Sequence, residues 1–155
     1  MEKLTRPVIA GNWKMYKTIS EARQLAAEIV SQAASLNQAS LILIPPFTAI
    51  QEVKKTVSGS RLLVGGQDLF WEEEGAFTGE ISARQLKEAG CDVVIVGHSE
   101  RRQYFGETDE TVKKKVLAAL RHELRPIVCI GENLEERKSG ETLKKIKSQL
   151  ENSLF

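Results

Sequence analysis

Five short apolar runs rich in β-branched residues recur along the chain, and each is followed by a longer segment with helical spacing. The runs are Pro7 to Ala10, Leu41 to Ile44, Leu62 to Val64, Asp92 to Val96 and Pro126 to Ile130. This alternation predicts βα units that build a parallel sheet. Because apolar residues follow one another in these runs, we expect the strands to be buried on both faces.

Apolar residues spaced three and four apart predict the helices that cover this sheet. The predicted core positions are Ala22, Leu25, Ala26, Ile29, Val30 and Ala33 in a first helix, Val112, Val116, Leu117 and Leu120 in a second, and Leu143, Ile146 and Leu150 in the last. No linker or shift in composition interrupts the pattern. We therefore predict a single domain over residues 1–155.

The charge balance argues against two classes of partner. With 22 basic and 21 acidic residues the net charge is +1, which gives no field to attract nucleic acid or an anionic membrane. The sequence contains neither a secretory leader nor a run of about 18 apolar residues, so we expect a cytoplasmic protein. Cys91 and Cys129 lie in or beside apolar runs without metal-ligand spacing, which predicts reduced core residues and no metal site.

A weak repeat places a polar residue after glycine at the end of four of these runs. The polar residues are Asn12, Gln67, His98 and Glu132. In a parallel sheet all four emerge at the carboxyl edge, where α/β proteins bind their ligands. The alternative is structural: each glycine ends a strand, and the polar residue caps the following helix.

Four motifs make the pattern specific. They are Gly11-Asn12-Trp13-Lys14-Met15, Gly75-Ala76-Phe77-Thr78-Gly79-Glu80, Val96-Gly97-His98-Ser99-Glu100-Arg101-Arg102 and Cys129-Ile130-Gly131-Glu132. In these motifs and their order the chain resembles the triosephosphate isomerase family. The resemblance implies a (β/α)8 barrel, which takes about 250 residues. A chain of 155 residues then predicts the fold class α/β, an incomplete TIM barrel of about five parallel βα units.

The resemblance also implies a reaction and roles for individual residues. The reaction interconverts dihydroxyacetone phosphate and glyceraldehyde 3-phosphate through an enediolate, without metal or organic cofactor. His98 would be the neutral electrophile, with a short helix over Ser99 to Phe105 after it. Lys14 would stabilise the substrate's negative charge, with Asn12 bound near the substrate oxygens and Glu100 as the ionic partner of Lys14. Read alone, Lys14 is a surface lysine and Glu100 a helix-terminal carboxylate.

Two features predict self-association. In the family, the long loop corresponding to Gln67 to Ser82 projects into a second subunit, with Thr78 near the partner's active site. A sheet of five strands also leaves the edges of its first and last strands unpaired, and paired edges are more stable than exposed ones. We expect a homo-oligomer.

Other family features are missing from these residues. The family's general base is a Glu in an AYEPVWAIGTG segment, and glycine-rich loops near the barrel's end bind the phosphate. Neither occurs here, so we expect a truncated or split isomerase that is inactive alone. A self-assembling, non-catalytic half-barrel with a structural or regulatory role is the alternative. A dinucleotide-binding domain is disfavoured because no G-x-G-x-x-G follows the first run.

Three residues depart from the family pattern. Tyr16 and Asp68 stand where the family often has Asn, and Glu123 stands where it usually has Gly after a helix. A left-handed conformation would cost a non-glycine residue about 1 to 2 kcal/mol. We therefore expect this helix end to be remodelled.

Overall fold

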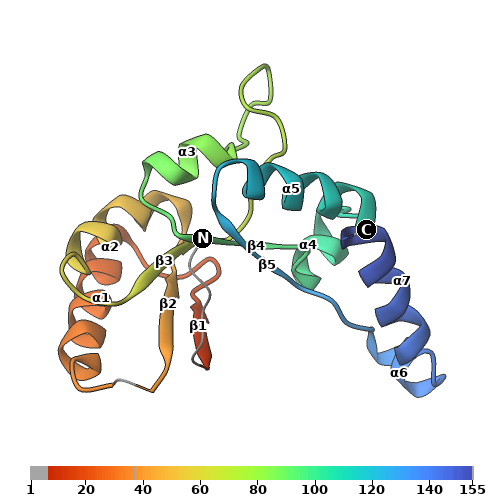
Figure 1. The fold of residues 1–155 in the computed structure, drawn as a ribbon, viewed down its shortest axis with the longest axis horizontal. Coiled ribbons are helices and arrows are strands. Elements are labelled where there is room, and N and C mark those ends of the chain that lie inside the picture. The colour runs from red at the N-terminus through yellow and green to blue at the C-terminus, as the bar shows by residue number, and fades with distance from the viewer. Residues whose placement is uncertain (1–6, 37, 155) are drawn as a thin grey trace.

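Every strand of the sheet pairs with its neighbour in sequence. The computed structural model describes residues 7–36 and 38–154, whose five strands pair in parallel in the order β1-β2-β3-β4-β5. The strands are β1 (Val8–Asn12), β2 (Ser40–Ile44), β3 (Leu63–Gly66), β4 (Val93–Val96) and β5 (Arg125–Val128). Figure 1 shows them curled into an open half-barrel with the helices on the outer side. This confirms the predicted incomplete barrel of parallel βα units.

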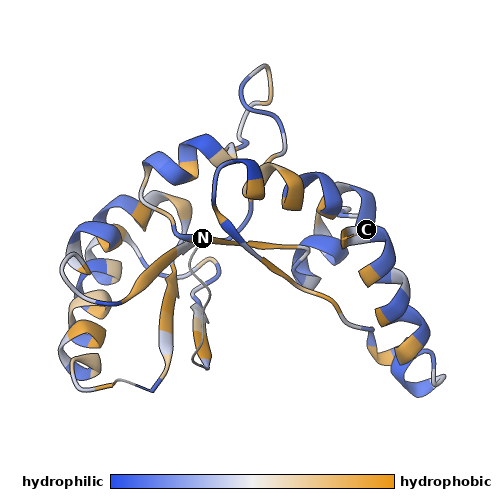
Figure 2. Cartoon of the chain, in the orientation of Figure 1, coloured by the Kyte–Doolittle hydropathy of each residue, from blue (hydrophilic) through white to orange (hydrophobic). Residues whose placement is uncertain are grey.

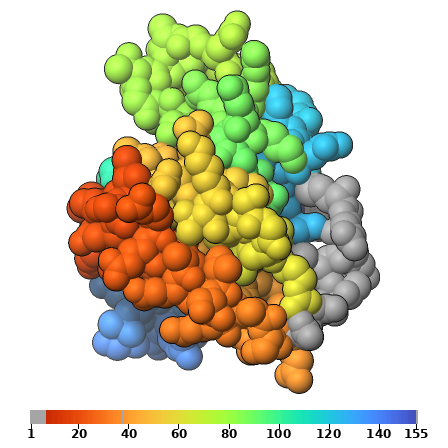
Figure 3. Space-filling model, turned by 90° about the vertical axis from the view of Figure 1, so that its left-hand side faces the viewer, coloured from red at the N-terminus to blue at the C-terminus, as the bar shows by residue number. Residues whose placement is uncertain are grey.

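Helices fill the connections, and four of them begin at a capping box. The helices are α1 (Ile19–Ala33), η1 (Phe47–Ala49), α2 (Ile50–Thr56), α3 (Ala83–Glu88), α4 (Ser99–Tyr104), α5 (Asp109–Arg121), α6 (Leu134–Lys138) and α7 (Thr142–Leu154). Thr18, Ser82, Thr108 and Asn133 each accept a hydrogen bond from the third helical residue, whose side chain accepts one in return. Helices α1 and α2 lie side by side on the face seen in Figure 3.

The sheet buries side chains on both faces in its middle. Toward the helices, Leu43, Val64, Val94 and Val96 pack in the main core. On the inner face, Ile42, Ile44, Val93 and Ile95 form a second, smaller cluster. The apolar strands run along the inside of the arch in Figure 2. Alternation of side chains along each strand divides the apolar runs between these two clusters.

The expectation of complete burial is wrong for the outer strands. Val8 and Ile9 of β1 are 46% and 61% exposed, and every residue of β5 is partly exposed. An outer strand has a neighbour on only one side, and the inner face of β1 has no opposite wall among the described residues.

The predicted core faces of two helices also need correction. In α5, Val112 and Val116 are buried as predicted, but Leu117 and Leu120 are 52% and 44% exposed. Lys115, Ala118 and Ala119 are buried instead. In α7, Leu143 is 81% exposed, and the buried side chains are Gln149 and Ser153. Helix α7 packs against α5, so its polar residues meet polar groups there: Ser153 Oγ lies 3.3 Å from Asp109 Oδ1.

The end of α5 is not remodelled. Glu123 adopts a left-handed conformation with φ of 55°. Its N–H donates to the carbonyl of Leu120, and the N–H of Leu124 donates to that of Ala119, which is the Schellman arrangement normally completed by glycine. Burial of Leu124 stabilises this end of the helix despite the strained glutamate.

Candidate active site

The carboxyl edge of the sheet gathers the predicted site residues from three strands. Asn12 ends β1, Gln67 follows β3, and His98 lies two residues after β4. Asn12 Oδ1 accepts a hydrogen bond from the N–H of Lys14 at 3.0 Å, and Gln67 Nε2 donates to the carbonyl of Lys14 at 2.8 Å. Both polar groups of the Lys14 backbone are therefore satisfied by side chains, which holds this residue at φ of 52°.

The Lys14 side chain reaches across the edge to α4. Its Nζ donates to Glu100 Oε1 at 2.6 Å, and the two side chains are 47% and 41% exposed. The hydrogen bond from Lys14 lowers the pKa of Glu100, and the same bond raises the pKa of Lys14. An ammonium has three N–H donors, so Lys14 has donors left for a ligand while it is paired.

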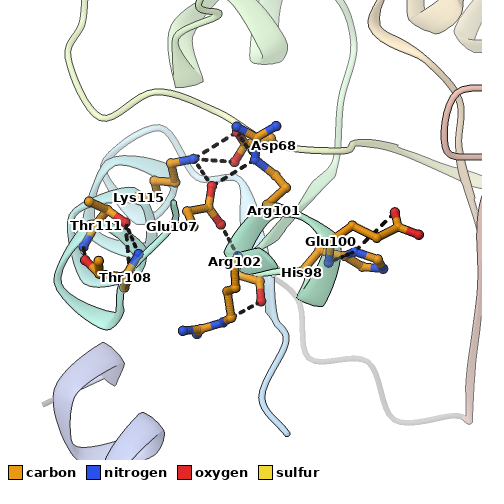
Figure 4. Close-up of polar contacts among 10 residues, drawn as sticks. Asp68, His98, Glu100, Arg101, Arg102, Glu107, Thr108, Thr111 and Lys115 are labelled. Atoms are coloured by element: carbon orange, nitrogen blue, oxygen red, sulfur yellow. Dashed lines mark hydrogen bonds and ion pairs between the residues drawn. The ribbon is translucent and has the colours of Figure 1, made fainter. Parts of the chain in front are cut away.

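His98 caps the N-terminus of α4, which confirms the short helix predicted after it. Its Nδ1 accepts a hydrogen bond from the N–H of Glu100 at 3.2 Å, as Figure 4 shows. An acceptor Nδ1 carries no proton, so in the neutral ring the proton lies on Nε2. The ring is mostly buried, with 22% of the side chain exposed. Nε2 is therefore the ring nitrogen that can donate to a ligand.

Gly97 makes the turn from β4 to His98 possible. It has φ of 72°, and a Cβ there would lie 3.0 Å from Arg102 Nη2, 3.0 Å from Val112 Cγ2 and 3.2 Å from the carbonyl oxygen of Cys129. Its carbonyl accepts from Arg102 Nε at 2.8 Å, and its N–H donates to Glu107 Oε2 at 3.1 Å. A side chain at this position would displace the start of α4.

A buried ion cluster lies behind α4 (Figure 4). Lys115 Nζ donates to the Asp68 carboxylate oxygens at 2.7 and 2.8 Å, and it also contacts Glu107. Arg101 Nε lies 2.7 Å from Asp68 Oδ2 and 2.9 Å from Glu107 Oε1. The cluster balances two carboxylates with two cations and joins β3, α4 and α5. Loss of one partner from such a cluster typically costs about 3 to 5 kcal/mol.

Burial and ion pairing act differently on the two carboxylates. Burial raises the pKa of Asp68 to about 6, against the opposing effect of Lys115. Burial alone would also raise the pKa of Glu107, but hydrogen bonds from Lys115 and Arg101 outweigh it and lower that pKa. Sequence reasoning missed this cluster. The signal was Lys115, three residues after Val112 on the core-facing side of α5, where a buried lysine requires a carboxylate.

Two further predicted residues, Thr78 and Glu132, have other surroundings. Thr78 is exposed in the loop that projects at the top of Figure 1, and the neck of this loop is closed by the bridge between Phe70 and Ser82. Glu132 pairs with Arg137 of α6 at 3.6 Å. Thr78 therefore cannot serve the site of its own chain in this conformation.

The cysteines and helices carry no further site. Burial raises the pKa of Cys91 to about 12 and also raises that of Cys129, and both are free thiols. In residues 7–36 and 38–154, no group of three or more His, Cys, Asp and Glu side chains could hold a metal ion. No helix in this part of the chain is long and apolar enough to span a membrane.

Comparison with known proteins identifies this arrangement. A model of the triosephosphate isomerase family matches residues 7–155. The chain belongs to the triosephosphate isomerase family. It is 53% identical to the triosephosphate isomerases of Thermoanaerobacter pseudethanolicus and Moorella thermoacetica, in each case over 97% of this chain and 60% of the relative. The chain thus spans about 60% of the length of these relatives.

A solved structure supports the family at the level of the fold. The crystal structure of triosephosphate isomerase from Bartonella henselae superposes with a TM-score of 0.91 at 42% identity, over 97% of this chain and 62% of that one. The five parallel strands therefore form an incomplete TIM barrel. The closed fold contains eight strands.

Proposed function

We propose that this chain contributes the electrophilic half of a triosephosphate isomerase site, for the interconversion of dihydroxyacetone phosphate and glyceraldehyde 3-phosphate in the cytoplasm. The observation that supports this most is the linked geometry of His98, Glu100 and Lys14. Glu100 donates its N–H to His98 Nδ1 and accepts from Lys14 Nζ. One residue thus orients both the neutral imidazole and the cation toward the carboxyl edge.

The chemistry follows from this geometry. A proton moves between adjacent carbons, and negative charge develops on the oxygens that they carry. His98 Nε2–H donates to these oxygens, and Lys14 stabilises their charge together with that of the phosphate. Asn12 holds the Lys14 backbone and binds beside the substrate. These groups are fixed before the substrate arrives, so little reorganisation accompanies the reaction.

The general base is not among the residues that the carboxyl edge brings together. In the proposal, the glutamate base and the phosphate-binding loops come from further βα units, supplied either by the same polypeptide or by a separate chain. Loss of a general base typically lowers the rate by a factor of about 10² to 10⁴. Residues 1–155 alone should accordingly show negligible turnover and weak or no binding of the triose phosphate.

Complementation tests this function. The 155-residue chain is assayed for isomerase activity alone and after co-refolding with the C-terminal part of the Moorella thermoacetica relative, which supplies the missing units. We expect activity only in the mixture, and we expect His98→Ala to abolish it while leaving the isolated chain unchanged. A mixture that assembles but has no activity that depends on His98 would refute the proposal.

Self-assembly is the second candidate function, and the exposed outer strand favours it. Val8 and Ile9 present apolar side chains on β1, at one end of an open sheet. In this alternative the chain forms a homo-oligomer without turnover, through its strand edges or the loop that carries Thr78. Assembly that persists while the complemented mixture stays inactive would favour this reading.

A further inference from the structure

Two consecutive residues after β3 reach in opposite directions. Gln67 contacts the segment that carries Lys14, and Asp68 contacts the helix that carries His98 and Glu100. Lys14 and Glu100 form an ion pair across the carboxyl edge. Gln67 and Asp68 thus contact the segment on the Lys14 side of this pair and the helix on its Glu100 side.

The Gln67 side acts on the Lys14 backbone. Its Nε2 donates to the carbonyl of Lys14 at 2.8 Å and to that of Ile44, the last residue of β2, at 3.2 Å. One amide therefore ties the strained Lys14 peptide to the end of a buried strand. The carbonyl of Lys14 is held by Gln67, and its N–H is held by Asn12.

The Asp68 side acts on α4. Asp68 is 4% exposed, and its Oδ2 lies 2.7 Å from Arg101 Nε, next in sequence to Glu100. Lys115 holds the same carboxylate from α5 at 2.7 Å. Helix α4 has only six residues, so its own hydrogen bonds fix its direction weakly. The ion pair between Asp68 and Arg101 in its first turn is one of the contacts that hold it in place, together with those that Glu107 and Asp109 make with Arg101 and Arg102.

We propose that Gln67 and Asp68 form a positioning pair that sets the spacing between Lys14 and helix α4, and so keeps His98 and Glu100 in register with Lys14. Neither residue touches the reacting atoms. Their importance for catalysis depends on the proposed isomerase function, whereas their effect on the geometry does not.

The titration of Glu100 measures this spacing directly. Lys14 lowers the pKa of Glu100 through their hydrogen bond, so any separation of Lys14 from α4 returns that pKa toward its ordinary value of 4.5. The experiment follows the Glu100 carboxyl carbon by NMR across a pH series in the 155-residue chain, with the variants Asp68→Asn and Gln67→Met.

The two possible effects of Asp68→Asn have opposite signs. Removal of a nearby negative charge, acting through space alone, lowers the pKa of Glu100 further. Loss of register with Lys14 raises it. We expect a rise for Asp68→Asn and also for the charge-neutral Gln67→Met. A fall or no change in either variant overturns the proposal.

Controls separate positioning from general destabilisation. Asp92→Asn breaks a partly buried ion pair with Lys54, where Asp92 precedes β4 at the opposite edge of the sheet, and Gln149→Met removes a buried amide from α7. Both should leave the Glu100 titration unchanged, and a shift equal to that of the test variants contradicts the proposal. If Asp68→Asn does not fold, Asp68→Asn with Lys115→Met restores the charge balance and should show the same rise.

The readout keeps the two proposals apart because it needs no turnover. A rise in the Glu100 pKa together with failed complementation refutes the isomerase function and leaves the positioning pair intact. Complementation that succeeds without the rise supports the function and refutes the pair. When both hold, Gln67→Met in the complemented mixture should lower kcat more than it raises KM, because it displaces groups that act in the transition state.

Discussion

Glu123 occupies a backbone conformation that favours glycine, with φ of 55°. Its side chain is exposed, so replacement removes strain without loss of packing. We expect Glu123→Gly to raise the free energy of unfolding by about 1 kcal/mol, measured by urea denaturation. As a matched control, Glu151→Gly in the exposed part of α7 should lower it by about 1 kcal/mol. Equal effects of the two substitutions would contradict this explanation.

Asp68 makes stability depend on pH in a definite direction. Burial raises its pKa from 3.8 to about 6 in the folded state, so the folded protein binds this proton more tightly than the unfolded chain. The stabilisation that comes from this tighter proton binding is complete below pH 3.8 and is lost as the pH rises through about 6. The free energy of unfolding of the unsubstituted chain, relative to that of Asp68→Asn, should therefore increase from pH 7 to pH 5. Urea denaturation at each pH measures this difference. A constant difference over this range would exclude the effect.

The sequence predicted single residues best where a motif marks them. Asn12, Lys14, His98 and Glu100 lie in motifs, and the structure brings them to one edge. The partner of Lys115 was not predictable in the same way, because Asp68 lies 47 residues earlier and no local pattern links the two. The roles of the edge residues in catalysis stay predictions.

The start of α4 depends on space as well as on backbone conformation. Gly97 and Gly106 have similar left-handed φ values of 72° and 68°, but a Cβ has no neighbour within 4 Å at Gly106 and three close neighbours at Gly97. We expect Gly106→Ala to cost about 1 kcal/mol from strain alone. Gly97→Ala should cost clearly more, by thermal or urea unfolding, because Arg102 and Val112 must also move. Equal costs would mean that the contacts at Gly97 relax freely.

Elements were predicted better than the faces they bury. The five apolar runs are all strands, with ends shifted by at most two residues, because β-branched runs between turns have few other solutions. In α5, Val112 and Val116 are buried as predicted, but the leucines of α5 and Leu143 of α7 are exposed. Apolar periodicity indicates that a helix face is apolar, but it does not indicate which neighbour covers that face. In α5, Lys115 is buried against carboxylates while Leu117 is exposed.

For the whole molecule, we predict that the open inner face of the sheet mediates self-association. Val8 on β1 lies on the same inner face as Ile42 and is 46% exposed, and Leu117 on the outside of α5 is 52% exposed. If chains associate through this inner face, Val8→Lys should weaken self-association at least tenfold in sedimentation equilibrium across a dilution series. Leu117→Lys, on the outer helical layer, should leave it unchanged. A monomer at every concentration for the unsubstituted chain would refute association through this strand.

The strand order has a consequence for how this chain reaches its fold. Because β1 to β5 pair strictly in sequence order, each pairing closes a loop of similar, modest length, and none waits for a distant segment. No pairing among the described strands spans more than one βα unit. Each βα unit can therefore pair with the one before it during synthesis from the N-terminus.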